Sequence, residues 1–115
     1  MRAPRSRPIV LREMKEHAVF WRDSAAPGML YGGGVVVDGG RLRLRGTDGR
    51  FRVVETVPAA DLAAVAPGGS SEPIGEYPSL RLDLRSGRSI VLAAVLGTAA
   101  LVELVDNLLG LLPSG

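Results

Sequence analysis

The stretch Arg41-Leu42-Arg43-Leu44-Arg45 alternates strictly between basic and apolar residues. The turn residues Gly46-Thr47-Asp48-Gly49 separate it from Arg50-Phe51-Arg52-Val53, which alternates in the same way. Successive side chains of a β-strand point to opposite faces, and Gly and Asp between two such runs are typical of a hairpin turn. We therefore expect a hairpin with its arginines on one face. The residues expected to face a core are Leu42, Leu44, Phe51 and Val53.

Similar signals lie on both sides of this hairpin. Tyr31-Gly32-Gly33-Gly34-Val35-Val36-Val37 predicts a strand whose glycines permit a bend or bulge, and Asp38-Gly39-Gly40 predicts the turn that follows. Val57-Pro58 should end the strand after Phe51, and residues 61–65 form a short segment before a loop over residues 67–73. Leu80-Arg81-Leu82-Asp83-Leu84-Arg85, the turn Ser86-Gly87 and Arg88-Ser89-Ile90-Val91-Leu92 predict a further hairpin.

The C-terminal part of the chain predicts an amphipathic helix over residues 98–112. Thr98 is a suitable N-cap, and Gly110 and Pro113 mark the end. Apolar residues form one stripe at helical spacing, with Glu103, Asp106 and Asn107 opposite. The stripe consists of Leu101, Leu104, Val105, Leu108 and Leu112.

The N-terminal part is read as a flexible basic tail over residues 1–8, followed by a helix or strand plus a loop over residues 9–29. Apolar positions between Ile9 and Trp21 recur at steps of three and four, which predicts a short helix. The aromatic and β-branched cluster Ala18-Val19-Phe20-Trp21 supports a strand instead. His17 is expected to pack or to lie on the surface, and Trp21 to pack against the rest of the domain.

Short strands joined by tight turns predict an α+β domain built on an antiparallel meander, because parallel strands need long crossovers. The expected architecture is a partly open β-barrel or sandwich capped by the C-terminal helix. Over residues 30–115 this order of elements resembles the pleckstrin-homology-like (PH-like) superfold, in particular its small bacterial members. The resemblance is carried by Val35–Asp38, Arg41–Arg45, Phe51–Val65, Leu80–Leu92 and Thr98–Leu112.

The PH-like resemblance implies a seven-stranded barrel and a binding module for peptides, proteins or anionic lipid headgroups rather than a catalyst. In relatives that bind phosphoinositides, basic residues of the first two strands and their loop form the site. Arg41, Arg43 and Arg45 stand at the matching positions here. The turn Asp38-Gly39-Gly40 departs from that pattern, because it carries an acid and no lysine.

Composition excludes several function classes. The chain has no cysteine and one histidine, which excludes disulfides, thiolate or multi-histidine metal sites and a cysteine nucleophile. We therefore expect no enzyme activity, metal or cofactor.

Two apolar stretches are interrupted by charged residues. Glu103 and Asp106 interrupt the stretch over residues 90–112, and Arg12-Glu13 ends the short run over residues 9–11. Neither a membrane span nor a signal peptide is expected, and the expected location is the cytoplasm, including the inner face of the membrane.

Charge is distributed unevenly along the chain. Residues 1–54 carry a net charge of +6, and residues 55–115 a net charge of −4. Arginine forks suit carboxylates and phosphates, so the candidate ligand-binding residues are Arg41, Arg43, Arg45, Arg50 and Arg52. The expected partner is a protein, which includes a second copy of the chain, bound at this arginine-rich face or at a sheet edge. Anionic lipid or nucleic acid is the alternative. A third interpretation is an ordinary solvated face on which Asp38, Glu55 and Asp83 neutralise the arginines.

Overall fold

A computed structural model of the chain describes residues 16–38, 40–67 and 74–112. Within these ranges seven strands form one sheet in the order β4-β3-β2-β1-β7-β6-β5, and every pair of neighbours is antiparallel. One α-helix follows the last strand. The elements are β1 (Glu16–Asp23), β2 (Tyr31–Asp38), β3 (Arg41–Thr47), β4 (Arg52–Pro58), the 3-10 turn η2 (Ala59–Asp61), β5 (Leu62–Pro67), β6 (Ser79–Leu84), β7 (Ser89–Ala94) and α2 (Thr98–Leu109).

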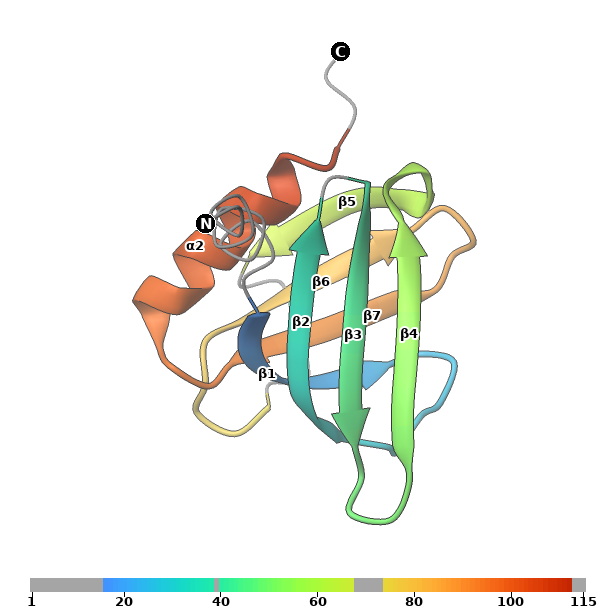
Figure 1. Cartoon of the computed structure of the whole chain (residues 1–115), viewed down its shortest axis with the longest axis vertical. Coiled ribbons are helices and arrows are strands. Elements are labelled where there is room, and N and C mark those ends of the chain that lie inside the picture. The colour runs from blue at the N-terminus through green and yellow to red at the C-terminus, as the bar shows by residue number, and fades with distance from the viewer. Residues whose placement is uncertain (1–15, 39, 68–73, 113–115) are drawn as a thin grey trace, which may run out of the picture.

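The sheet curls into an open half-barrel. In Figure 1, β2, β3 and β4 stand upright in front, and β5, β6 and β7 cross behind them. Strand β1 joins the two halves, because Glu16 to Trp21 pair with β2 and Val19 to Asp23 pair with β7. The predicted α+β class, with an antiparallel meander and a C-terminal helix, is therefore confirmed.

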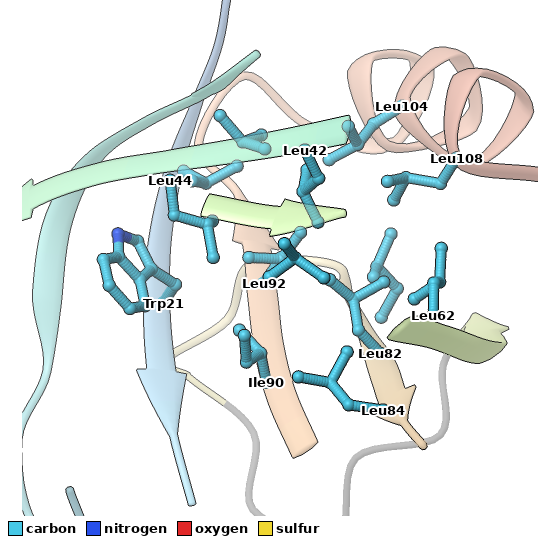
Figure 2. Close-up of a cluster of buried hydrophobic side chains, with 14 of the residues drawn as sticks. Trp21, Leu42, Leu44, Leu62, Leu82, Leu84, Ile90, Leu92, Leu104 and Leu108 are labelled. Carbon is cyan, nitrogen blue, oxygen red and sulfur yellow. The ribbon is translucent and has the colours of Figure 1, made fainter. Parts of the chain in front are cut away.

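The inner face of the curled sheet is apolar, and α2 lies against its rear half, at β5, β6 and β7. Leu104 and Leu108 of the helix are fully buried. Figure 2 shows both side chains directed from α2 into a cluster that includes Leu62 and Leu82. Alternate residues of β3 and β6, together with four of the six residues of β7, supply much of the remaining core. The helix thus covers the apolar inner face, as the leucine stripe predicted.

Strand β1 replaces the helix predicted over residues 9–21. That prediction is wrong for the residues described, and the alternative strand at Ala18–Trp21 is correct. The buried positions of β1 are His17, Val19, Trp21 and Asp23, of which two are polar. Because polar residues occupy half of the inward positions, the sequence of this strand lacks an apolar alternation. Residues 1–8 and 9–15 lie outside the described residues.

Several predicted boundaries shift. Gly46 and Thr47 extend β3 instead of forming a turn, so the connection to β4 comprises residues 48–51. Helix α2 ends at Leu109, three residues before the predicted end, and Gly97 rather than Thr98 is its N-cap. Gly97 has φ of +102°, a conformation that glycine adopts without strain. Gly39 and residues 68–73 and 113–115 of the predicted turns and loops lie outside the described residues.

The length of α2 bears on membrane insertion. A helix needs about 20 predominantly apolar residues to span a bilayer. Among residues 16–38, 40–67 and 74–112, none of the helices meets this requirement.

The substitution Leu104→Ala tests the role of α2 in covering the core. It should lower the free energy of unfolding by about 2 to 5 kcal/mol, because it opens a cavity at a fully buried position. Val102→Ala, on the same helix but 55% exposed, should change it by less than about 0.5 kcal/mol. Urea denaturation followed by circular dichroism measures both. Equally small effects would mean that α2 does not cover the core.

Candidate functional site

The outer face of β3 carries three of the predicted site residues. Arg41, Arg43 and Arg45 are exposed, whereas Leu42 and Leu44 between them are fully buried. Residues two apart on a strand lie about 7 Å apart on the same face. The arginines therefore form a row on the front of the half-barrel. We call the outer face of β3 and β4, with Arg41, Arg43, Arg45 and Arg52, the arginine face.

The pairing of β3 with β4 interleaves the charges of this face. Arg43 lies opposite Thr56, Arg45 opposite Val54, and Arg52 opposite Thr47. Like charges directly opposite each other on a sheet are destabilising, and this register avoids every such pair between β3 and β4. Arg52 therefore lies on the arginine face as predicted, one strand away from the row of β3.

Arg50 does not join the arginine face, because it lies in the connection between β3 and β4. The carboxylate of Asp48 accepts hydrogen bonds from the backbone N–H groups of Arg50 and Phe51, at 2.9 and 3.0 Å. These two hydrogen bonds lower the pKa of Asp48. The Arg50 guanidinium lies 5.5 Å from the centre of the Phe51 ring.

Phe51 was expected in the core and is instead 64% exposed. Its place in the alternation is that of an inward residue, but β4 begins at Arg52. Phe51 therefore lies beyond the last paired row, Thr47 with Arg52, where no opposite layer covers it. Val53, one row further in, packs against the core as predicted.

Two arginines of the face have acidic partners. Arg45 bonds the carboxylate of Glu16 through Nε at 3.1 Å and through a terminal nitrogen at 2.5 Å. Arg41 lies 3.5 Å from Asp38, so one of the predicted neutralising contacts exists. The predicted roles of Glu55 and Asp83 are wrong, because these acids pair with Arg88 and Arg81.

Arg43 and Arg52 differ from their neighbours on the arginine face. Both are exposed, and within residues 16–38, 40–67 and 74–112 neither forms an ion pair. A guanidinium group is always charged and presents its donors in a fork that fits a carboxylate or phosphate. These two side chains are therefore available to an external anion.

The glycines of β2 explain how Glu16 reaches Arg45 across a whole strand. Gly34 lies between Ala18 of β1 and Arg45 of β3 in the sheet. A Cβ atom at Gly34 would stand 2.6 Å from the Glu16 carboxylate, so any side chain there would displace it. At Gly33 a Cβ atom would collide with the Arg45 carbonyl oxygen. The glycine run, predicted as a bend or bulge, thus makes room for this ion pair.

Two shallow hollows lie on the arginine face. The larger, of about 410 Å³, has a glycine floor and is bordered by Arg45, Arg52 and Val54. The smaller, of about 180 Å³, lies between Glu16, Arg43 and Val54. Arg45 and Val54, which is 64% exposed, border both hollows, and we call the two hollows together the groove. An apolar side chain with a charge on either side fits this groove.

A separate ionic cluster joins the two halves of the barrel. Arg88, in the turn between β6 and β7, pairs with buried Asp23 at the end of β1 and with Glu55 of β4 at 3.1 Å. The hydrogen bonds from Arg88 lower the pKa of Asp23, and the two acids raise that of Arg88. Arg88 is 65 positions from Asp23 and 33 positions from Glu55 in the sequence, so no local pattern could have predicted these contacts.

The histidine lies away from the arginine face. His17 is buried beneath α2, with Nε2 3.2 Å from the Asn107 amide nitrogen and Nδ1 3.8 Å from Glu103. It is a packed histidine, which is one of the two predicted environments. Among the described residues, no group of three or more acids and histidines is arranged to hold a metal ion.

Comparison with known proteins adds a fold relationship. No protein-family model and no curated protein match the chain. A solved structure, the C-terminal domain of an unknown protein from Leishmania infantum, is similar with a TM-score of 0.62 and 13% identity. The match covers 92% of this chain and 94% of that one. At this identity the likeness concerns the fold alone, over nearly the whole of both chains.

The Arg88 cluster predicts a pH dependence of stability. Folding lowers the pKa of Asp23 below the ordinary carboxyl pKa of 3.8. Ionised Asp23 therefore stabilises the native state at pH values above 3.8, and this stabilisation is lost as the pH falls through the lowered pKa. Asp23→Asn should therefore lower the free energy of unfolding by about 1 to 3 kcal/mol at pH 7. The difference from the unsubstituted chain should shrink towards pH 2.

Denaturant titrations at several pH values measure this difference. Asp83→Asn is the matched control, because its ion pair with Arg81 lies within one strand, both side chains are partly exposed, and such a pair contributes less than about 1 kcal/mol. A destabilisation by Asp23→Asn that is the same at pH 7 and pH 2 would contradict the assignment.

Proposed function

We propose that this chain is a non-catalytic binding domain of the PH-like type that recognises a protein partner through the arginine face. Support for the fold type comes from the seven strands, the antiparallel pairing of all neighbours in the sheet and the C-terminal helix against the inner face. This arrangement accounts for all elements on which the resemblance rested. It also places the apolar stripe of α2 inside and leaves the face of β3 and β4 to solvent.

The observation that carries the function concerns Arg43 and Arg52, two exposed arginines on either side of exposed Val54 for which the described residues supply no acidic partner. Arginine is enriched at protein interfaces, where its planar group pairs with carboxylates and packs on apolar surface. Two uncompensated cations around an apolar residue favour a ligand with both properties. A protein segment has both.

A protein partner is favoured over a polyanion by the acids on the same surface. Glu16 and Asp38 neutralise Arg45 and Arg41, which lowers the positive field that a lipid surface or nucleic acid would meet. Single-strand binders also need aromatic platforms, and aromatic residues make up 4% of the chain. The placement of His17 beneath α2 supports binding rather than acid–base catalysis, because its ring lies outside the groove.

Charge reversal tests the proposal. Arg43→Glu and Arg52→Glu should each reduce capture of the partner from a cell extract at least tenfold, because each removes one cation and adds a repelling anion. Arg85→Glu makes the same change in charge at an exposed position in the turn after β6, and should alter capture less than twofold. Quantitative mass spectrometry of the bound fraction measures the effect. A partner retained equally by all variants would refute a role for the arginine face.

Titration with polyanions tests the alternative partner. The chain should bind phosphatidylserine vesicles and single-stranded oligonucleotides only weakly at physiological salt. If phosphates are the ligand, the logarithm of the binding constant will instead fall with the logarithm of the salt concentration, by about 0.7 to 0.9 per neutralised phosphate. Such a slope, abolished by Arg43→Glu, would replace the protein partner with a phosphate-bearing one.

A further inference from the structure

The sheet has two edge strands, and they differ in charge. Strand β5 has the sequence Leu-Ala-Ala-Val-Ala-Pro and carries no charged residue. Strand β4, at the other end of the sheet, carries Arg52 and lies next to the row of arginines on β3. An edge strand offers backbone donors and acceptors to an added strand, and neighbouring side chains then select its sequence. The charges therefore mark β4 as the selective edge.

The register of β3 and β4 fixes where an added strand would meet these charges. Three successive rows on the outer face contain Arg43 with Thr56, then Arg45 with Val54, then Thr47 with Arg52. Rows are about 7 Å apart, which is the spacing of residues k, k+2 and k+4 in an extended segment. A strand beside β4 would thus place k at the Arg43 row, k+2 at Val54 and k+4 at Arg52.

We propose that the chain binds an extended acidic segment as an eighth strand along β4, with the pattern acidic-x-apolar-x-acidic. This inference rests on the proposed function and specifies its ligand. One carboxylate pairs with Arg52 directly across the edge. The other reaches Arg43 over the short side chain of Thr56. The apolar side chain between them fills the groove at Val54, which both hollows share.

The other face of β4 and its ends restrict the segment further. Positions k+1 and k+3 would stand opposite Glu55 and Val53, and Glu55 already pairs with Arg88. An acid at k+1 would be repelled there. Pro58 lacks a backbone donor and ends β4, so added pairing is confined to the rows before it. The acidic pattern reads the same in both directions, so it applies to a parallel or an antiparallel segment.

Arg43 and Arg52 would also select against incorrect partners. A neutral strand on β4 would leave both guanidinium groups without an anion, and a basic strand would meet direct repulsion. The same side chains that attract an acidic segment thus protect the edge from pairing with β4 of another copy, which brings arginines of its own.

The test uses fluorescent peptides and the full chain. The first peptide carries Glu-Thr-Val-Thr-Glu between threonines, and the second has the same composition with both glutamates adjacent. Fluorescence anisotropy should give at least tenfold tighter binding for the first peptide. Arg52→Glu should weaken its binding at least tenfold, and replacing one glutamate of the peptide by lysine should restore binding to this variant. Arg85→Glu should bind the first peptide as the unsubstituted chain does.

Hydrogen exchange locates the bound segment. The first peptide should slow exchange of alternate backbone amides between Arg52 and Val57 and leave those of β5 unchanged. Slowed exchange at β5 would place the ligand on the other edge and overturn the proposal. Equal affinity of the two peptides, or no binding of either at millimolar concentration, would also overturn it. Self-association that charge reversal at Arg43 abolishes would identify a second copy as the occupant instead.

Different results would contradict the acidic strand on β4 and the proposed function of the arginine face. If neither peptide binds but capture of a partner still depends on Arg43 and Arg52, the arginine face retains its proposed function and the acidic strand is wrong. If capture is independent of both arginines, the proposed function itself is wrong.

Discussion

The structure depends on the burial of one apolar face of a single curled sheet. Seven strands in the order β4-β3-β2-β1-β7-β6-β5 give a continuous inner surface, and α2 closes it with Leu104 and Leu108. Burying such a side chain contributes about 1.5 to 3 kcal/mol, so the leucines decide which face of each strand turns inward. On β3 the leucines face inward, so the arginines that alternate with them face outward. The charged surface of this domain is therefore a direct result of how its core is filled.

The charged side chains of the domain have two roles. Long-range ion pairs hold elements together: Glu16 reaches from β1 to Arg45 of β3, and Arg88, in the turn between β6 and β7, joins β1 to β4. Arg43 and Arg52, in contrast, have no acidic partner among the residues that the structure describes. Because Arg41 and Arg45 pair with Asp38 and Glu16, the arginine face carries a small, specific pattern of positive charge at Arg43 and Arg52 in place of a diffuse positive surface.

Strands with strict alternation were predictable, because their inward and outward residues differ in polarity: β3 and β6 are examples. The helix was predictable from its leucine stripe. Strand β1 was predicted only as the alternative to a helix, at Ala18–Trp21, because His17 and Asp23 occupy inward positions and find polar partners far along the chain. Phe51 was assigned inward by alternation, but alternation does not show where the opposite layer ends. Of the predicted arginines, Arg41, Arg43, Arg45 and Arg52 lie on the arginine face and Arg50 does not, because alternation does not show where β4 begins. The ion pairs of this face required the register across β2.

Trp21 is an intrinsic fluorescent probe of this domain. The chain has one tryptophan, and its indole lies in the core, where it donates to the Arg45 carbonyl oxygen at 3.3 Å. The backbone of β3 alone separates the fluorophore from the outer surface beside Arg45. Intrinsic emission should therefore respond to any displacement of β3, so that occupancy of the front surface can be followed without attaching a dye.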